Sequence, residues 1–316
     1  MVSIVVCTYN GERYLREVLQ AILNQKDFSI YVENVLVVDN ASIDDTKKIV
    51  MEFCRKYPVV KYEYEPISGL TYARKHAAYM SSEWVAFLDD DNIVTENWLV
   101  QMMGFIKSNN LLGVCNSACI ATPAVKFSER EMSILYAVAP GLACTHACME
   151  SYVHNDPPMI STPFGAGMFI RTRQLKRYLE EGWTTSIGRT KDNLASGEDG
   201  EIARAVLKQG FSYGYNNKAA ILHIIPHRRI EDDYLVRLSE GLDEGYYRFL
   251  RSQKYALIKL MMVFSKNCLL IFLDPIIRLR KKSNYEKTRW AYSIRSRKNI
   301  NRLIVGIKRK DDKRNE

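Results

Sequence analysis

Three aspartates stand in a row directly after a segment that predicts a buried strand. The segment 84–88 is short and apolar, and Asp89, Asp90, Asp91 and Asn92 follow it. Burying three carboxylates together is costly without a cation, because like charges repel and lose hydration. Hard carboxylate oxygens bind divalent cations such as Mg²⁺ and Mn²⁺, and such a cation can hold the oxygens of a diphosphate. These residues indicate a cation site, with a solvated acidic turn as the alternative.

The chain around these aspartates alternates between strand and helix patterns. Apolar runs predict strands at 2–8, 34–38, 60–64 and 84–88, and helical spacing of apolar residues predicts helices at 12–25, 44–57 and 70–80. Strict alternation predicts an α/β fold with a mostly parallel, doubly wound sheet flanked by helices. In such sheets ligands bind at the carboxyl ends of the strands. The candidates there are Thr8, Tyr9, Asn10 and Glu12 after the first strand, Asp39 after the second, Arg74 beyond the third and the aspartates after the fourth.

The pattern is less regular in the second part of the chain. We expect a helix at 96–107 and a strand at 113–118, and then an irregular, substrate-facing segment at 120–165, which has no clean period and several prolines. Strands at 167–171 and 218–223 and helices at 174–181 and 198–209 resume the α/β pattern. No Gly-x-Gly-x-x-Gly or Gly-x-x-x-x-Gly-Lys follows a strand, which argues against a nicotinamide-dependent oxidoreductase and a P-loop protein.

The basic character of the chain belongs to its C-terminal part. Residues 251–316 contain 19 Lys and Arg against five Asp and Glu, a balance of +14, which leaves 26 against 31, or −5, for residues 1–250. This argues against a nucleic-acid surface on the main domain. Apolar helical patterns beside the basic residues predict an amphipathic helical extension on an anionic membrane surface, since no apolar run reaches the roughly 18 residues of a span. The alternatives are packing on its own domain or in a homodimer.

The cysteines and the first residues predict a reducing compartment. The start of the chain lacks a basic segment and a small-residue cleavage site, so we expect a cytoplasmic protein, peripheral on the inner face of the cell membrane. Seven cysteines, mostly in apolar stretches, are typical of buried reduced thiols. The pairs Cys115/Cys119 and Cys144/Cys148, with His146, are spaced outside the usual C-x2-C pattern, which argues against a zinc cluster.

Six motifs occur together in one order along residues 2–235. They are Val5-Val-Cys-Thr-Tyr-Asn10, Val37-Val-Asp-Asn-Ala-Ser42, Gly69-Leu-Thr-Tyr-Ala-Arg74, Phe87-Leu-Asp-Asp-Asp-Asn92, Gly165-Ala-Gly167 and Ser196-Gly-Glu-Asp199. This set resembles the family-2 glycosyltransferases with the GT-A fold. The resemblance implies a domain at 1–235, with a nucleotide-binding half (1–112) and an acceptor and catalytic half (113–235), before the helical, basic region 236–316.

The resemblance also implies roles for individual residues. Thr8 and the loop after it line the nucleotide pocket, Asp39 accepts a hydrogen bond from the base, and Arg74 lies near the base and diphosphate. Asp89-x-Asp91 corresponds to the DxD motif, with Asp91 the direct ligand of Mn²⁺ or Mg²⁺, Asp89 a further ligand candidate, and Asp89 and Asp90 near the ribose and sugar. Without the resemblance, Asp39 would be interpreted as a helix N-terminal cap and Arg74 as a surface cation.

An inverting transfer needs a general base for the acceptor hydroxyl. The resemblance assigns Asp199 as this base and Glu198 as the acceptor-positioning residue, with a helix N-cap as the alternative for the pair.

Further residues are assigned by similarity to bacterial members. His223 begins a stretch similar to their His-x-x-Pro-x-x-Arg, so it could complete the metal shell or contact the diphosphate; His227 is the rival, and a structural role is the alternative. Gly165, Gly167, Trp183 and Arg189 are expected on the donor-sugar and acceptor side. Asn92 replaces the usual fourth acidic residue, although its amide still offers an oxygen.

The leading hypothesis is an inverting enzyme that moves a sugar from a nucleotide donor, expected to be a UDP-sugar with guanosine and thymidine donors as rivals, to a lipid-linked or polysaccharide acceptor in surface glycan synthesis. A second hypothesis has a soluble or protein acceptor and uses the basic region for dimerisation. A third is a catalytically inactive relative that acts as a membrane-bound scaffold.

Overall fold

The computed structural model describes residues 1–145, 150–154, 164–181, 194 and 197–251. The chain divides into one compact unit at 1–190 and 198–227 and a second at 191–197 and 228–316. The predicted boundary at residue 235 stays a prediction. Most of the predicted basic extension, 252–316, lies outside the described residues, as do His146, Cys148, Trp183 and Arg189.

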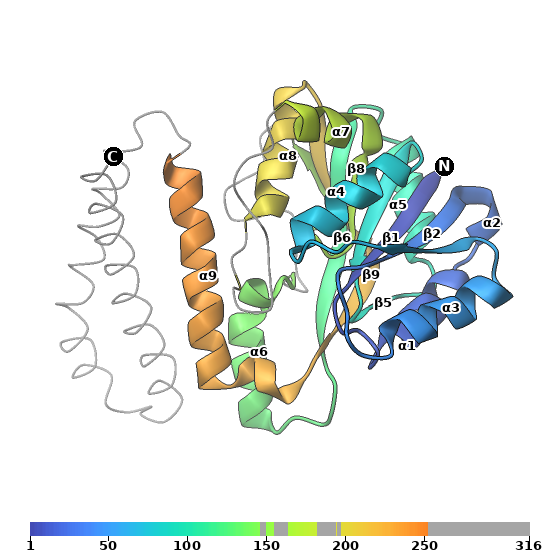
Figure 1. Ribbon diagram of the computed structural model, residues 1–316. Coiled ribbons are helices and arrows are strands. Elements are labelled where there is room, and N and C mark those ends of the chain that lie inside the picture. The colour runs from blue at the N-terminus through green and yellow to red at the C-terminus, as the bar shows by residue number, and fades with distance from the viewer. Residues whose placement is uncertain (146–149, 155–163, 182–193, 195–196, 252–316) are drawn as a thin grey trace, which may run out of the picture. The chain divides into compact units, whose positions relative to one another are not determined.

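A nine-stranded sheet forms the centre of the first unit (Figure 1). Its strands are β1 (Val2–Thr8), β2 (Val32–Asp39), β3 (Val60–Tyr64), β4 (Trp84–Asp89), β5 (Asn92–Val94), β6 (Leu112–Pro123), β7 (Tyr152–His154), β8 (Met168–Arg171) and β9 (Ser212–Ile225). They are ordered β3-β2-β1-β4-β8-β6-β9-β5, and β7 pairs with β9 outside this path. The strands β3, β2, β1 and β4 are parallel, as the alternating pattern predicts.

The second half of the sheet mixes directions. β8 pairs antiparallel with both β4 and β6, and β5 pairs antiparallel with β9. β6 and β9 run parallel, and both extend several residues beyond the predicted strands. This long pair carries the antiparallel β5, which begins only three residues after the end of β4. The acidic residues after β4 are thereby turned back against β9.

Helices cover both faces of the sheet. The helices are α1 (Leu15–Leu23), α2 (Phe28–Tyr31), α3 (Thr46–Lys56), α4 (Leu70–Met80), α5 (Trp98–Lys107), α6 (Glu129–Val138), α7 (Thr172–Glu180) and α8 (Glu198–Lys208), with 3₁₀ turns η1 (Ala139–Leu142) and η2 (His227–Ile230); α9 (Asp232–Arg251) belongs to the second unit. One face of the sheet packs against α4, α7 and α8. Alternate strand residues, including Val5 and Phe87, contact small residues of α4, such as Ala73 and Ala77, and apolar residues of α7 and α8. On α5, Trp98 is fully buried with its ring 5.1 Å from that of Phe169. The core therefore holds the strand ends in fixed positions.

The expectation of an irregular segment at 120–165 is wrong for residues 129–138, which form α6, and for 120–123 and 152–154, which lie in β6 and β7. Ser128 caps this helix by accepting a hydrogen bond from the Glu131 backbone N–H, while the Glu131 carboxylate accepts one from the Ser128 backbone N–H. This Ser-x-x-Glu capping box is visible in the sequence and identifies the start of a helix even where the apolar period is weak. Within the part of the chain that the structure describes, no helix is both long and apolar enough to cross a membrane.

Gln25 joins the first helix region to the start of α5. Its amide nitrogen donates to the Thr95 carbonyl (2.9 Å), and its amide oxygen accepts from the Leu99 backbone N–H (3.0 Å). Asn97, the N-cap residue of α5, makes no side-chain cap hydrogen bond. The acceptor for the helix N–H of Leu99 is instead supplied by Gln25, 74 residues earlier in the chain. The buried amide side chain thereby satisfies a free helix N–H.

We predict that Gln25→Leu lowers the free energy of unfolding by about 1–3 kcal/mol, because it removes the acceptor of the buried Leu99 backbone N–H. Urea unfolding followed by circular dichroism measures this. Gln20→Leu, on the exposed side of α1, is the matched control and should change stability by less than about 0.5 kcal/mol. Equal effects of the two substitutions would contradict the capping role of Gln25.

Candidate functional site

Asn92 folds the acidic turn at the end of β4. Its amide oxygen accepts a hydrogen bond from the Asp89 backbone N–H (3.0 Å), and its amide nitrogen donates to Asp91 Oδ1 (3.0 Å). The side chain is fully buried. The Asn92 amide oxygen, which the sequence suggested as an oxygen ligand for a cation, therefore accepts a hydrogen bond within the turn. An aspartate at this position would have no N–H to donate to Asp91, which gives the departure from the usual acidic motif a local physical reason.

Asp90 points toward the end of β1. Its Oδ2 accepts hydrogen bonds from the Thr8 hydroxyl (2.6 Å) and the Tyr9 backbone N–H (3.3 Å). Burial, together with the charges of Asp91 and Asp89, raises the pKa of Asp90 to about 7. Thr8 is therefore a hydrogen-bond donor to the acidic turn, and the crowded carboxylates are at a site where positive charge would be favourable.

Asp91 and His223 are brought together by the pairing of β5 with β9. Asn92 lies opposite His223 in this antiparallel ladder, and the Ile224 backbone N–H donates to the Asp91 carbonyl (2.9 Å). The Asp91 Oδ1 atom lies 3.5 Å from His223 Nε2, and both side chains are buried. Of the two histidines proposed from the sequence, the structure brings His223 to the acidic turn.

His227 lies against a different group. Its Nε2 is 2.6 Å from Glu131 Oε1 on α6, and its ring meets that of Phe127 edge-on at 5.7 Å. The side chain is half exposed. These contacts tie the turn after β9 to the start of α6.

The loop after β1 is joined to the loop after β2 by reciprocal hydrogen bonds. The Asn10 backbone N–H donates to the Ser42 hydroxyl (2.9 Å), and the Asn10 amide oxygen accepts from the Ile43 N–H (2.9 Å). The Glu12 N–H donates to Asp44 Oδ2 (3.1 Å), and the Glu12 carboxylate accepts from the Asp45 N–H (2.9 Å). Asn10 and Glu12 therefore hold two strand-end loops together, and the first turn of the expected helix at 12–25 is used in this junction.

Asp39 is buried at the end of β2. Its Oδ1 accepts from the Ser42 N–H (2.9 Å) and its Oδ2 from the Tyr62 hydroxyl (2.9 Å). The N-cap of the following helix α3 is Asp45, so Asp39 shapes the turn before the helix and is not its cap. Its carboxylate lies on the same edge of the sheet as the loops described above.

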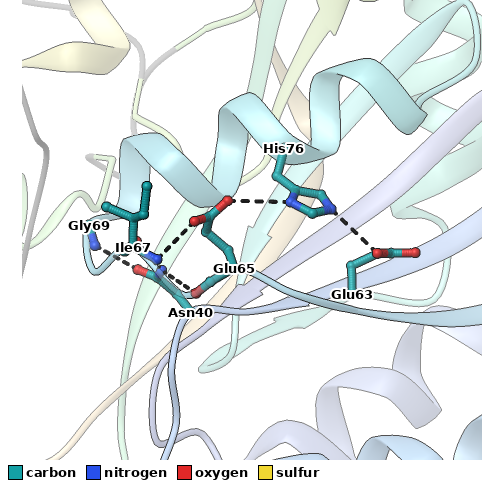
Figure 2. Close-up of polar contacts among 6 residues, drawn as sticks. All are labelled: Asn40, Glu63, Glu65, Ile67, Gly69 and His76. Atoms are coloured by element: carbon teal, nitrogen blue, oxygen red, sulfur yellow. Dashed lines mark hydrogen bonds and ion pairs between the residues drawn. The ribbon is translucent and has the colours of Figure 1, made fainter.

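Asn40 fixes the segment that leads into α4 (Figure 2). Its amide nitrogen donates to the carbonyls of Glu65 (3.1 Å) and Ile67 (2.7 Å), and its amide oxygen accepts from the Gly69 N–H (2.7 Å). His76 on α4 lies between the carboxylates of Glu65 and Glu63, at 3.3 and 3.4 Å. These contacts determine where α4 begins, and Arg74 is carried on this helix.

Arg74 lies against Glu198 and Asp199 at the start of α8. One guanidinium nitrogen, Nη1, contacts Glu198 Oε1 at 3.2 Å and Asp199 Oδ1 in a short ion pair. Arg74 and Glu198 are each 4% exposed, whereas Asp199 is 22% exposed. Burial opposes the charge on Arg74, but Asp199 and Glu198, with Asp89, outweigh this effect and raise the pKa of the guanidinium above its ordinary value. The partially exposed Asp199 is thus held by a buried cation.

Gly165 completes the surroundings of Asp199. Its backbone N–H donates to Asp199 Oδ2 (2.8 Å), so both carboxylate oxygens of Asp199 have a fixed donor. A Cβ atom at position 165 would collide with the Arg74 guanidinium and crowd Asp199. Glycine is required here because the backbone itself approaches the ion pair. This explains the first glycine of the Gly165-Ala-Gly167 motif, for which the sequence alone indicates only a close approach.

The charge of Asp89 affects both the acidic turn and the ion pair of Arg74 with Glu198 and Asp199. Its charge contributes to the raised pKa of Asp90 in the acidic turn and to that of Arg74 beside Asp199. The acidic turn therefore offers hard oxygen ligands to a divalent cation, and the neighbouring ion pair offers a positioned carboxylate. Chemically, such a site can hold an anionic phosphate group through a cation and accept a proton from a hydroxyl close to it.

Asn40 and Cys144 were visible in the sequence, but neither was assigned a contact or role around this site. Asn40 stands within the Asp39-Asn-Ala-Ser42 motif, and its neighbourhood in the chain carries no sign of the distant carbonyls that it binds. Cys144 Sγ lies 3.6 Å from His223 Nδ1, a contact across 79 residues. Trp183 and Arg189 lie outside the described residues.

Comparisons with known proteins identify relatives of this chain. Residues 3–138 match the family model described as glycosyl transferase family 2. The chain is 24% identical over 242 residues to the minor teichoic acid biosynthesis protein GgaB of Bacillus subtilis (strain 168), which covers 73% of this chain and 23% of that protein. It is 31% identical over 110 residues to the poly(ribitol-phosphate) beta-N-acetylglucosaminyltransferase TarS of Staphylococcus aureus (strain Mu50), covering 34% of this chain and 19% of that protein. The chain thus spans about a quarter or less of these relatives.

Solved structures have the same fold. The mannosyltransferase PcManGT from Pyrobaculum calidifontis, in complex with GDP-Man and Mn²⁺, superposes with a TM-score of 0.60 at 16% identity, covering 96% of this chain and 86% of that one. The crystal structure of S. aureus TarS 1–349 superposes with a TM-score of 0.53 at 16% identity, covering 98% and 91%. These likenesses confirm the predicted GT-A fold.

Proposed function

We propose that this chain, whose residues 3–138 match the glycosyl transferase family 2 model, transfers a sugar from a nucleotide-diphosphate donor to a hydroxyl acceptor with inversion. The observation that carries the proposal is Asp199, a partially exposed carboxylate fixed by the Gly165 N–H and by Arg74, whose charge is also stabilised by Asp89 of the acidic turn. A carboxylate held in this way can take a proton from an acceptor without reorganising.

In the proposed reaction Asp199 accepts the proton of the acceptor hydroxyl as its oxygen bonds to the anomeric carbon. The bond between that carbon and the diphosphate oxygen breaks, and its electron pair leaves with the nucleoside diphosphate. Arg74 and Gly165 hold Asp199 in place, and Glu198, fixed by the same guanidinium, positions the acceptor. Inversion follows because the acceptor attacks opposite to the leaving group.

We assign Mn²⁺ or Mg²⁺ to the acidic turn. The proposed ligands are Asp89 and Asp91, with His223 through Nε2, which already faces Asp91. The donor set of carboxylates and one imidazole suits a hard or borderline divalent ion. When bound, the cation would neutralise the charge of the diphosphate leaving group. Asp90 lies near the sugar and ribose side, and Thr8, Tyr9, Asn10, Glu12 and Asp39 form the proposed nucleotide-binding edge.

The names of the relatives support a choice of donor and acceptor class. TarS is named as an N-acetylglucosaminyltransferase acting on poly(ribitol-phosphate), one of its structures contains UDP-GlcNAc, and GgaB is named for minor teichoic acid biosynthesis. We propose a UDP-sugar donor and a surface-polymer or lipid-linked glycan acceptor. The alternative is an inactive relative that acts as a scaffold, and retention of both the acidic turn and Asp199 favours the enzyme.

We further propose that the basic region 251–316 binds an anionic membrane surface where such an acceptor would lie. This rests on its charge balance of +14 and its interfacial aromatics Trp290 and Tyr292.

Replacing Arg278, Arg280, Lys281 and Lys282 with Gln in the full chain should reduce flotation with phosphatidylglycerol-containing vesicles at least about tenfold, since each basic residue contributes about 1 kcal/mol at such a surface. Neutralising the exposed Lys26, Lys56, Lys61 and Lys107 is the control for net charge. Undiminished flotation of the first variant would place the membrane contact elsewhere or exclude it.

We predict that Asp91→Asn abolishes cation-dependent nucleotide binding. Thermal shift with UDP, GDP, dTDP and CDP, each with Mn²⁺, Mg²⁺ or a chelator, measures it, because a ligand at about 100 times its Kd stabilises the native state by about 2.7 kcal/mol. The wild type should respond to one nucleotide in the presence of cation. Glu52→Gln, on α3 in an ion pair with Arg16, is the control and should respond as the wild type does. An unchanged response of Asp91→Asn would remove Asp91 from the ligand set.

Asp199→Asn should retain donor binding and lose transfer by about 10²–10⁴-fold, the usual contribution of a general base. The amide keeps an oxygen for the Gly165 N–H but cannot accept a proton at neutral pH. Release of nucleoside diphosphate in the presence of acceptor gives the rate, and Glu181→Gln on the exposed surface after α7 is the control. Normal turnover by Asp199→Asn would mean that another group is the base.

A further inference from the structure

Two cysteine thiols and one histidine ring meet in the interior beside the acidic turn. Cys119 Sγ lies 4.0 Å from Cys144 Sγ, and Cys144 Sγ lies 3.6 Å from His223 Nδ1. The ligand atoms of the three residues all lie within 4.8 Å of one another. Cys119 and Cys144 are at most 1% exposed and His223 is 3% exposed. They form a compact group of three soft or borderline ligands, which we name the thiol cluster.

The backbone holds the thiol cluster in place. In the parallel ladder of β6 and β9, Ala121 lies opposite His223, so Cys119, two residues earlier on β6, is the diagonal neighbour of His223. The segment of Cys144 is attached to the same strand, since the Thr145 N–H donates to the Cys119 carbonyl (2.8 Å) and the Cys119 N–H donates to the Thr145 hydroxyl (3.0 Å). The Cys144 N–H donates to the Ala139 carbonyl (3.0 Å). Fixed backbone on each side means that the three groups can bind an ion with little rearrangement.

Two of the distances within the thiol cluster are close to those around a tetrahedral zinc ion. Zn–S bonds of about 2.3 Å and Zn–N bonds of about 2.0–2.1 Å place two sulfurs about 3.8 Å apart and a sulfur and a nitrogen about 3.6 Å apart. The Cys119 Sγ–Cys144 Sγ and Cys144 Sγ–His223 Nδ1 distances in the thiol cluster are 4.0 and 3.6 Å. Sulfur ligands also select against Mg²⁺ and Mn²⁺, which prefer oxygen. The thiol cluster is therefore chemically distinct from the carboxylates of the acidic turn.

The second nitrogen of His223 supports this arrangement. Its Nε2 lies 3.5 Å from Asp91 Oδ1. A histidine that binds zinc through one nitrogen commonly donates its other N–H to a carboxylate, which fixes the ring orientation and strengthens the ligand. With Nδ1 facing the sulfurs and Nε2 facing Asp91, His223 has this environment.

We propose that Cys119, Cys144 and His223 Nδ1 form a binding site for a soft divalent cation, with Zn²⁺ the expected ion. Binding converts the two thiols to thiolates and releases their protons, and the fourth coordination position is left for water. A neutral imidazole binds a cation through one nitrogen and keeps its proton on the other. Zinc on Nδ1 therefore puts the proton on Nε2, and His223 then donates to Asp91 and leaves the ligand set of the donor cation.

Metal titration of the full chain tests this site without any assay of transfer. The protein is purified with a reductant, stripped with a chelator and titrated with Co²⁺ and then with Zn²⁺ against a chromogenic chelator. We expect one strong site per chain and a thiolate-to-cobalt charge-transfer band in the near ultraviolet. Cys144→Ser and Cys119→Ser should each weaken zinc binding by more than about 100-fold, beyond the usual effect of losing an outer partner.

Cys115→Ser is the matched control, since Cys115 is also fully buried on β6 and lies outside the thiol cluster. It should bind zinc as the wild type does. Asp89→Asn separates the two cation sites and should leave the cobalt charge-transfer band in place. Equal zinc affinity in Cys144→Ser, or the absence of a charge-transfer band in the wild type, would overturn the proposal.

X-ray absorption spectroscopy of the zinc-loaded wild type tests the proposed ligands without depending on the folding of a variant. Two sulfur scatterers and one imidazole nitrogen are expected, and a shell of oxygen and nitrogen alone would exclude the site. The zinc site and the proposed transfer reaction can fail separately, because nucleotide binding with Mn²⁺ is measured independently. If both are present, adding zinc should weaken the Mn²⁺-dependent thermal shift, since zinc on Nδ1 removes His223 Nε2 from the proposed ligands of Mn²⁺.

Discussion

The buried contact of Arg74 with Glu198 and Asp199 is the interaction on which the arrangement of the site depends. It joins α4, which follows the third strand, to α8, which precedes the last long strand, across 124 and 125 residues of chain. A buried guanidinium is tolerated only with carboxylate partners, and removing one partner of such a group commonly costs about 3–5 kcal/mol. The Asn40 contacts before α4 and the glycine at position 165 both serve this geometry, because they set the start of the helix and leave room for the guanidinium.

The positions of the first four strands and the polar residues at their ends could be predicted from the sequence because they are local features. Apolar runs identify β1 to β4, and the polar residues directly after them lie at one edge of the sheet, as their positions in the chain require. The partners of these residues could not be predicted, since Arg74 was expected near a base and diphosphate and its contacts with α8 come from tertiary packing. The role of Asn92 was equally hidden, because only the turn geometry shows that its oxygen is used by the Asp89 N–H. Helix α6 was not predicted, although the Ser-x-x-Glu pattern of its capping box is present in the sequence.

The cysteines illustrate a limit of reading spacing along a chain. Cys115 and Cys119 are close in sequence, as are Cys144 and Cys148, and neither pair has the usual spacing of a zinc motif. The structure takes one member from each pair and adds a histidine from β9, so the ligand set has no sequence pattern at all. The register of the β6–β9 ladder shifts between Ser117, which lies opposite Asn216, and Ala118, which lies opposite Ala220. The extra residues of β9 at this point bring His223 to within two ladder positions of Cys119.

The three-residue strand β5 has a consequence for the order in which the molecule can be completed during synthesis. The acidic turn leaves the ribosome early, but β9, against which β5 pairs, is made more than 100 residues later. Until β9 arrives, the carboxylates of the turn remain in water, where their mutual repulsion is weak and no histidine is beside them. A nascent chain that contains the whole family-matched segment 3–138 thus still lacks the strand and the histidine against which the acidic turn packs. Because these contacts join distant parts of the chain, the acidic turn can reach its final surroundings only after β9 has been synthesised.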